Sequence, residues 1–346
     1  MLSYDAALVT LTGDIAVLYT AIRTFEKRLA YARDNVALQQ EALELAEARF
    51  QLGATSELDV QQSRSLLFNT QALIPALEIG LGTIRNALSL LLGMPPTDLQ
   101  TLLGGSGAGA IPNAPIDVVI GIPADLVRRR PDVRAAEMAA ATQSAAIGIS
   151  QAELYPHFAL AGSIGLAGET FSDQFESGSG TGFFTPFFSW NVLNFGRLKN
   201  NVRVQDARFE QLVVAYQNSV LNAAREVEDG LLGFLRSQEQ VGYLENAVIA
   251  AQRAAELALI QYGQGAVDYT RVLNTQTTLL LLQDALTLSQ GQVVASLVGV
   301  YKALGGGWQI READDYVVHD IKQRMRERTD WGDLLDTPAT SLPPSQ

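Results

Sequence analysis

The chain has 346 residues, of which 47% are hydrophobic and 18% charged, and its formal net charge is −12. This composition is typical of a folded protein with a large buried apolar surface. The acidic balance argues against a broad positive face for nucleic acid, and the lack of cysteine excludes disulfides, thiolate catalysis and cysteine-bound metal.

The N-terminal segment and the most apolar windows predict neither a signal peptide nor a membrane-spanning helix. The first residues lack a basic flank followed by a compact apolar core. The apolar stretch 286–304 is interrupted by polar side chains, so it falls short of about 18 consecutive apolar residues. Any membrane contact is therefore expected to use another element.

The sequence contains a duplication. Shifting the chain by 212 residues, the separation of Gly53 and Gly265, aligns its two parts without gaps. The aligned pairs include Tyr31 with Tyr243, Ala42 with Ala254, Leu45 with Leu257, Phe50 with Tyr262, Val60 with Val272, Leu67 with Leu279, Gln71 with Gln283 and Gly93 with Gly305. Self-similarity at a fixed offset predicts two copies of one structural unit.

Each copy is predicted to be a long helical hairpin closed by a short glycine turn. In the first copy, apolar residues recur at spacings of three, four and seven over 12–51 and over 57–92, the pattern of a packing stripe. In the second copy, helices are predicted over 196–262 and 268–304. The first of these is on the order of 100 Å long. Such lengths favour a rod or tube over a compact domain.

The predicted domains follow the duplication. We expect a first repeat over 1–103, a linker rich in glycine, serine and proline over 104–122, and a second repeat over 123–305. The second repeat is expected to open with a helix over 125–152. A C-terminal tail over 306–346 is expected to be partly disordered.

Two segments of the second repeat, 154–168 and 182–193, have strand rather than helix periodicity. In the first, large apolar residues such as Phe158 and Leu160 alternate with small ones. The second packs five aromatic residues into 183–190. Strands of about ten residues with an apolar face are typical of a transmembrane β-hairpin, and equally of a soluble hairpin that covers a core. These residues alone leave both interpretations open.

The sequence offers few residues for catalysis. His157 and His319 are its only histidines and stand in unrelated contexts, so neither a metal cluster nor a histidine-based triad is predicted. The glycines of 104–109 lack the following lysine and hydroxyl residue of a phosphate-binding loop. We therefore expect no enzyme and no cofactor.

The two hairpin turns carry the first candidate functional residues. They are Gly53, Ala54 and Ser56 at the first turn and Gly265 and Ala266 at the second. Both glycines stand where a helix reverses, a position that commonly needs a positive φ. An ordinary turn explains the glycines but not the residues shared around them, which favours a docking surface or gate.

A basic stretch lies between the repeats, with Arg128, Arg129, Arg130 and Arg134 around Pro131. A nucleic-acid or lipid contact is one interpretation, but the net charge favours a structural role. Proline and the acid that follows it suit the first turn of a helix, so the arginines stand at a joint. We expect them to pair with a neighbouring chain or with acids of the tail, namely Glu312, Asp314 and Asp315.

Several segments resemble one known family. They are RFQLGATSELDVQQSR, QYGQGAVDYTRVLNTQ, GIPADLVRRRPDVRAAE, SWNVLNFGRLKNNV and YKALGGGW. Together with the tandem hairpins they resemble the TolC-like outer membrane efflux protein family, and in particular its NodT-type lipoprotein branch. The resemblance extends over about residues 4–333.

The resemblance implies a mainly α fold with a small β part, assembled as a homotrimer. Strands of each chain would join a shared β-barrel in the lipid of the Gram-negative outer membrane, and the hairpins would form a periplasmic α-barrel. A periplasmic adaptor and an inner membrane pump, of the RND type, would complete a tripartite system that exports drugs or other small molecules. No nucleic acid partner is implied.

The resemblance also assigns site residues. The glycine turns match the tips that face the adaptor, and Tyr262 matches an aromatic that hydrogen-bonds across the closed entrance in some members. Asp59 matches its acidic partner on the other hairpin. Members often carry an acid after the second turn, where this chain has Arg271 and Asn274, with Asp268 as the nearest substitute.

The chain departs from the family pattern at its beginning. The family's signal, lipid-bearing cysteine, first inner helix and first strand pair would all precede residue 1. Three chains with a single strand hairpin each would supply too few strands for the family's pore and leave open edges in lipid. We therefore expect a partial reading frame. The alternative functions are a fragment without transport activity and a soluble coiled-coil scaffold.

Overall fold

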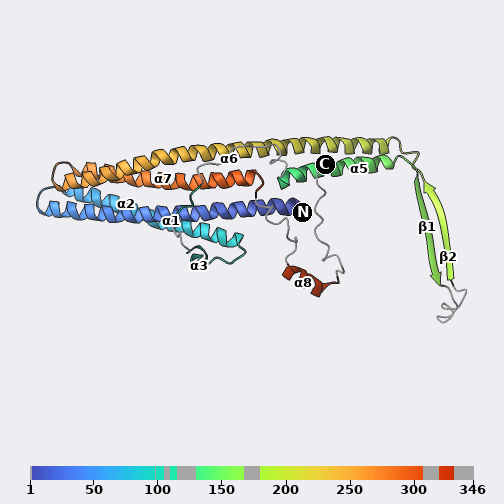
Figure 1. Ribbon diagram of the computed structural model, residues 1–346, viewed down its shortest axis with the longest axis horizontal. Helices are drawn as coiled ribbons and strands as arrows, with labels where there is room; N and C mark the ends of the chain where they lie inside the picture. The colour runs from blue at the N-terminus through green and yellow to red at the C-terminus, as the bar shows by residue number, and fades with distance from the viewer. Residues whose placement is uncertain are drawn as a thin grey trace. The chain divides into compact units, whose positions relative to one another are not determined.

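The computed structural model describes residues 2–97, 99–104, 110–114, 130–166, 180–306 and 319–330. The elements are α1 (Leu2–Gln51), α2 (Glu57–Leu91), α3 (Gln100–Leu103), α5 (Pro131–Ala152), β1 (His157–Leu166), β2 (Gly180–Ser189), α6 (Arg197–Gly263), α7 (Tyr269–Ala303) and α8 (His319–Arg328). The predicted class, mainly helical with a small strand hairpin, is confirmed (Figure 1). The chain divides into two compact units, Asp132–Asn222 and the remainder.

The larger unit is built from two helical hairpins. Within it, α1, α2, α7 and the C-terminal part of α6 run side by side, and the turns α1–α2 and α6–α7 lie at the same end (Figure 1). In the first hairpin, Ile22 and Leu29 of α1 pack against Leu81 and Leu88 of α2. In the second, α6 packs on α7 through Val248, Ala251, Ala255, Leu279 and Leu286. The buried stripes therefore stabilise each hairpin by removing apolar side chains from water.

The two hairpins contact each other mainly along α1 and α7, in an antiparallel arrangement. Near the turns the contact is apolar, with Ala42 and Ala46 packed near Tyr269 and Val272. At the far end, Lys302 Nζ donates to Asp14 at 3.1 Å. These two contacts fix which residue of α1 lies opposite which residue of α7 between them.

Between those ends the α1–α7 contact is polar. We call this stretch the polar seam, and its members are Thr24, Arg28, Asn35 and Gln39 of α1 and Gln276, Gln283, Asp284 and Thr287 of α7. Arg28 makes a two-pronged contact with Asp284, with Nε to Oδ1 at 2.6 Å and Nη2 to Oδ2 at 3.2 Å. Asn35 Nδ2 donates to Gln283 Oε1 at 2.6 Å. Because a polar pair is satisfied only when its partners face each other, these contacts fix the register of the two hairpins.

Two glutamines of the polar seam are buried without partners. Gln39 and Gln276 are each 1% exposed, and neither side-chain amide hydrogen-bonds to any described residue. They stand at the same level of the antiparallel pair, between the layer of Ala42 and Val272 and the bonded pair of Asn35 and Gln283. Such buried, unpaired amides are costly, so this level is the weak point of the seam.

Helix α1 also passes a simple test for membrane spanning, although the sequence predicts no such helix. By length and composition, its residues Ser3–Gln51 are long and apolar enough to cross a bilayer. The core helix of a folded protein passes the same test, and α1 packs on both α2 and α7. Packing against α2 and α7 accounts for the buried part of the apolar surface of α1.

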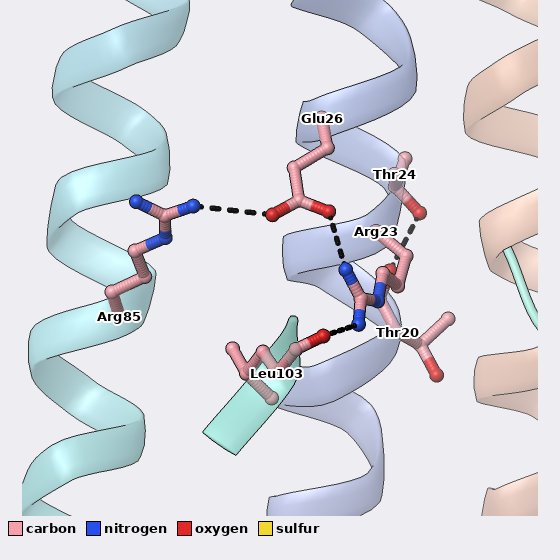
Figure 2. A network of polar contacts seen from close by, with 6 residues as sticks. All are labelled: Thr20, Arg23, Thr24, Glu26, Arg85 and Leu103. Carbon is pink, nitrogen blue, oxygen red and sulfur yellow. Dashed lines mark hydrogen bonds and ion pairs between the residues drawn. The ribbon is translucent and has the colours of Figure 1, made fainter. Parts of the chain in front are cut away.

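A network of ion pairs and hydrogen bonds attaches α3 to the first hairpin (Figure 2). Arg23 of α1 donates to Glu26 at 2.8 Å and to the carbonyl of Leu103 at the end of α3. Arg85 of α2 donates to the other oxygen of Glu26 at 3.1 Å. Leu99 is buried beside the same helices. The segment that follows α2 is thus held against α1 by both apolar and charged contacts.

Arg130 lies at the predicted joint and is 8% exposed. Its Nη1 donates to Glu226 of α6 at 2.8 Å and to the carbonyl of Ala303, the last residue of α7, at 2.9 Å. A cation at this position complements the negative end of the helix dipole. Arg134 lies on α5, whereas Arg128, Arg129 and the predicted acidic partners of the tail lie outside the described residues. Pairing with the tail stays a prediction.

The smaller unit consists of α5, the first part of α6 and the strand hairpin. Gln143 of α5 donates to Gln205 of α6 at 2.8 Å. Strands β1 and β2 pair antiparallel from His157 opposite Ser189 to Leu166 opposite Gly180. The second strand ends at Ser189, before the predicted 193, and Trp190 Nε1 instead donates to the carbonyl of Leu154 at 3.0 Å. Most of the loop predicted between the strands lies outside the described residues.

Both faces of the strand hairpin are exposed. Phe158 is 79% exposed and Ile164 is 81% exposed, and the aromatic residues of β2 are similarly uncovered. The rings of Phe158 and Phe188 lie 6.1 Å apart on one face. No described part of the chain covers this apolar surface, so it does not serve as the lid of a core in this chain.

Candidate functional site

The two turns at the hairpin tips have the same backbone structure. Gly53 has φ of 72° and Gly265 has φ of 76°, a region that residues with a Cβ rarely adopt. Gly53 N donates to Phe50 O at 2.9 Å, and Gly265 N donates to Tyr262 O at 2.9 Å. Ala54 and Ala266 each close a wider turn in the same way. Each glycine ends its helix with a left-handed residue, and the two turns thus repeat each other.

Behind the turns, side chains of all four helices meet. We call this group the tip cluster, and its members are Arg49, Thr55, Asp59, Tyr262 and Tyr269. Tyr262 Oη donates to Asp59 Oδ2 at 3.2 Å and so joins the two hairpins. Thr55 also donates to Asp59 Oδ2. Tyr269 packs its ring edge-on against Tyr262, with the ring centroids 5.3 Å apart at 73°.

The electrostatics of the tip cluster favour a neutral phenol that donates a hydrogen bond. Burial raises the pKa of Tyr262, and the nearby Asp59 carboxylate raises it further, while Thr55 and Arg49 act in the opposite sense. Burial likewise raises the pKa of Tyr269. Tyr262 therefore stays protonated across the physiological range, and its hydroxyl is available to the carboxylate of Asp59.

The remaining gate candidates lie around a different feature. Asp268, Arg271 and Asn274 help to line an open hollow of about 380 Å³ beside the second turn, with Ala251 and Ala254 of α6 on its other side. Asp268 caps α7, because its Oδ1 accepts from the backbone N–H of Arg271 at 3.2 Å. The structure thus brings Asp59 and Tyr262 together, and gathers the other three at the hollow.

Sequence reasoning did not select Arg49, Thr55 or Tyr269. Two signals were available in the sequence. Tyr269 is an aromatic residue directly after the capping Asp268, and Arg49 is a cation next to Phe50, which aligns with Tyr262. Among the residues that the structure describes, no group of three or more histidine or acidic side chains is placed to hold a metal ion. The tip cluster joins the two hairpins through a polar contact.

Comparisons with known proteins agree with this architecture. The family model for outer membrane efflux proteins matches residues 2–94 and 122–306. The solvent efflux pump outer membrane protein SrpC of Pseudomonas putida is 34% identical over 307 residues, which are 88% of this chain and 64% of SrpC. Nodulation protein T of Rhizobium leguminosarum bv. trifolii is 31% identical over 309 residues, which are 88% of this chain and 65% of that protein.

Solved structures give the same result. The structure of the outer membrane channel OprN superposes with a TM-score of 0.83 at 28% identity, and the match covers 89% of this chain and 68% of OprN. The chain thus spans somewhat under two thirds of the length of SrpC and of Nodulation protein T. From the matched residues and the shared fold, the chain belongs to the outer membrane efflux protein family.

Proposed function

We propose that this chain is a subunit of an outer membrane channel that exports small molecules from a Gram-negative bacterium as part of a tripartite efflux system. Family membership supports this proposal, together with relatives named as outer membrane proteins of solvent, toluene and pyoverdine export. The channel provides a path and catalyses nothing, since the energy comes from the pump. The exported compound is set mainly by that pump.

The observation that carries the proposal is the uncovered strand hairpin. Its ten-residue strands have the length that crosses a bilayer at a tilt, and their apolar and aromatic side chains are exposed. Outer membrane lipid would cover the apolar side chains on one side of the hairpin. Strands of neighbouring copies would pair with the backbone N–H and C=O groups along its edges. A soluble scaffold would leave the same surface in water, which disfavours that alternative.

The helical hairpins are proposed to form the periplasmic part of a homotrimer, with the tip cluster as its gate. The hydrogen bond between Tyr262 and Asp59 holds the second hairpin against the first. Breaking it would free one hairpin to move and widen the entrance. Asp268, Arg271 and Asn274 are proposed to line the same entrance, where the cationic Arg271 argues against a purely acidic ring.

The glycine turns are proposed as the docking tips for a periplasmic adaptor, which links the channel to an RND-type inner membrane pump. Apolar side chains stand exposed beside the first turn, with Leu52 at 83% exposed and Leu58 at 64%. An exposed apolar tip on a chain of net charge −12 is suited to an apolar contact with a partner helix. The backbone of the two turns would contact the adaptor at Gly53, Ala54, Ser56, Gly265 and Ala266.

The proposal is tested by deleting the gene in its host and measuring retention of a panel of fluorescent dyes and antibiotics in energised cells. Retention should rise for at least part of the panel and return to normal on complementation. Density-gradient fractionation should place the tagged protein in the outer membrane. Unchanged retention across a broad panel, or a protein that stays soluble without detergent, would refute the proposal in favour of a scaffold.

A further inference from the structure

We infer that Arg49 is a positioning residue that couples the two docking turns to the contact between Tyr262 and Asp59. This inference rests on the proposed function, because it assigns a role within the proposed gate. Arg49 stands in the last turn of α1, between the first turn and the second hairpin. One guanidinium group contacts the ring and the first turn and lies beside the second turn.

The first contact is with the aromatic ring of Tyr262. The guanidinium carbon of Arg49 lies 4.4 Å from the centroid of the Tyr262 ring. At this distance a cation is attracted to the aromatic face, and more strongly so where water is excluded. Tyr262 is 1% exposed, and it also makes the hydroxyl bond to Asp59 and packs against the edge-on ring of Tyr269. Arg49 thus restrains the ring in the orientation from which its hydroxyl reaches Asp59.

Arg49 also contacts the first turn and lies beside the second. Arg49 Nη2 donates to the carbonyl of Ala54 in the first turn at 3.4 Å. The same nitrogen lies 3.5 Å from where a Cβ on Gly265, in the second turn, would stand. A displacement of either turn therefore changes the position of the guanidinium on the Tyr262 ring. The planar, forked guanidinium suits this bridging role better than a point charge.

The arrangement is also easy to release. The bond to Ala54 is long, and Arg49 Nη1 is buried without a hydrogen-bond partner among the described residues. A guanidinium with an unused donor loses little by leaving and gains a bond if an acceptor oxygen of a docking partner reaches the tip. We therefore expect adaptor contact at the turns to draw Arg49 from the ring and weaken the hold of Tyr262 on Asp59.

The duplication shows that this cation is specific to one tip. The residue aligned with Arg49 in the second repeat is Gln261, so the helix end tolerates an uncharged side chain of similar shape. Arg49→Gln is accordingly the variant of choice. Arg64→Gln is the matched control, because Arg64 also lies near the tip but pairs with Glu47 at 2.7 Å on the exposed surface and is no part of the tip cluster.

The experiment measures passive dye entry in cells whose pumps are de-energised, with each variant at the native locus and entry scaled to the amount of channel in the outer membrane. Arg49→Gln should raise entry about three- to tenfold, as expected for losing one partly buried cation–π contact. Arg49→Lys, which keeps a cation over the ring, should recover most of the closed state. Arg64→Gln should leave entry unchanged.

A second background separates coupling from simple stability. In cells with Tyr262→Leu, which itself should raise entry, adding Arg49→Gln should have little further effect, because Arg49 acts through the ring. Equal effects of Arg49→Gln in both backgrounds, or no effect in either, would overturn the inference. If Tyr262→Leu alone leaves entry unchanged, the proposed gate fails instead, and with it the role of Arg49.

Discussion

The two unpaired glutamines of the polar seam lead to a prediction that opposes the usual effect of core mutations. The double variant Gln39→Met and Gln276→Met should be more stable than the native protein. Both side chains are 1% exposed and their amides lack partners among the described residues. Methionine has nearly the same length and shape, so it fills the space without polar groups that need hydrogen bonds.

The magnitude follows from the burial. Leaving a buried polar group unpaired costs about 1–3 kcal/mol, so removing two such amides should raise the free energy of unfolding by about 2–6 kcal/mol. For a folding unit of this size, each kcal/mol shifts the melting temperature by about 2–4 °C. We therefore expect the helical transition, followed by far-UV circular dichroism in detergent, to move upward by about 4–24 °C.

Two matched substitutions test the reasoning. Gln283→Met, seven positions along the same helix, removes the acceptor of the 2.6 Å bond from Asn35 and should lower the melting temperature. Gln71→Met, at the aligned and exposed position of α2, should leave it unchanged. A double variant of Gln39 and Gln276 that melts below the native protein would refute the reasoning, since the amides would then contribute favourable contacts.

Three further predictions concern the joint and the tips. Arg130→Met removes two bonds of a buried cation and should lower the free energy of unfolding by about 1–3 kcal/mol, measured by urea titration. Gly53→Ala and Gly265→Ala should each cost about 1–2 kcal/mol in the same titration, because both need a positive φ. Since burial raises the pKa of Tyr262 and Tyr269 above 10.0, the stability they contribute is complete below about pH 10. This stability should fall as the pH rises further, because the two tyrosines ionise first in the unfolded state. Replacing Tyr262 and Tyr269 by phenylalanine should remove this loss from the pH dependence of the melting temperature.

The sequence was sufficient for the long helices, the glycine turns and the strand hairpin, but not for the short helices α3 and α8. Apolar residues at spacings of three and four specify which face of each helix is buried, and alternation in 158–166 specifies a strand. Helix α2 runs through Pro75 without interruption, because the packing of its two halves against α1 outweighs the loss of one backbone bond. Duplication then showed that both hairpins share one design.

Periodicity could not show which helix covers which face. The apolar spacing of α1 predicts that the face carrying Gln39 is buried, but it is the same whether α2 or α7 covers that face. The polar seam was therefore not predictable from one sequence. The contact between Asp59 and Tyr262 joins residues 203 positions apart and was expected only through family resemblance. Arg49 was missed for a related reason, because a helix-end arginine is ordinarily a solvated side chain and only the packed tip shows the ring beneath it.

The tip cluster also records how the two repeats diverged after duplication. In the shared register, Tyr262 corresponds to Phe50 and Asp59 corresponds to Arg271. The pseudo-symmetric counterpart of the tyrosine–carboxylate bond would therefore join a ring without a hydroxyl to a cation, which offers no such bond. An ancestor with identical hairpins would have had two equivalent contacts or none. With the internal symmetry lost, the described residues hold one tyrosine–carboxylate bond between the hairpins, so a mutation on either side of it has no second described copy to compensate.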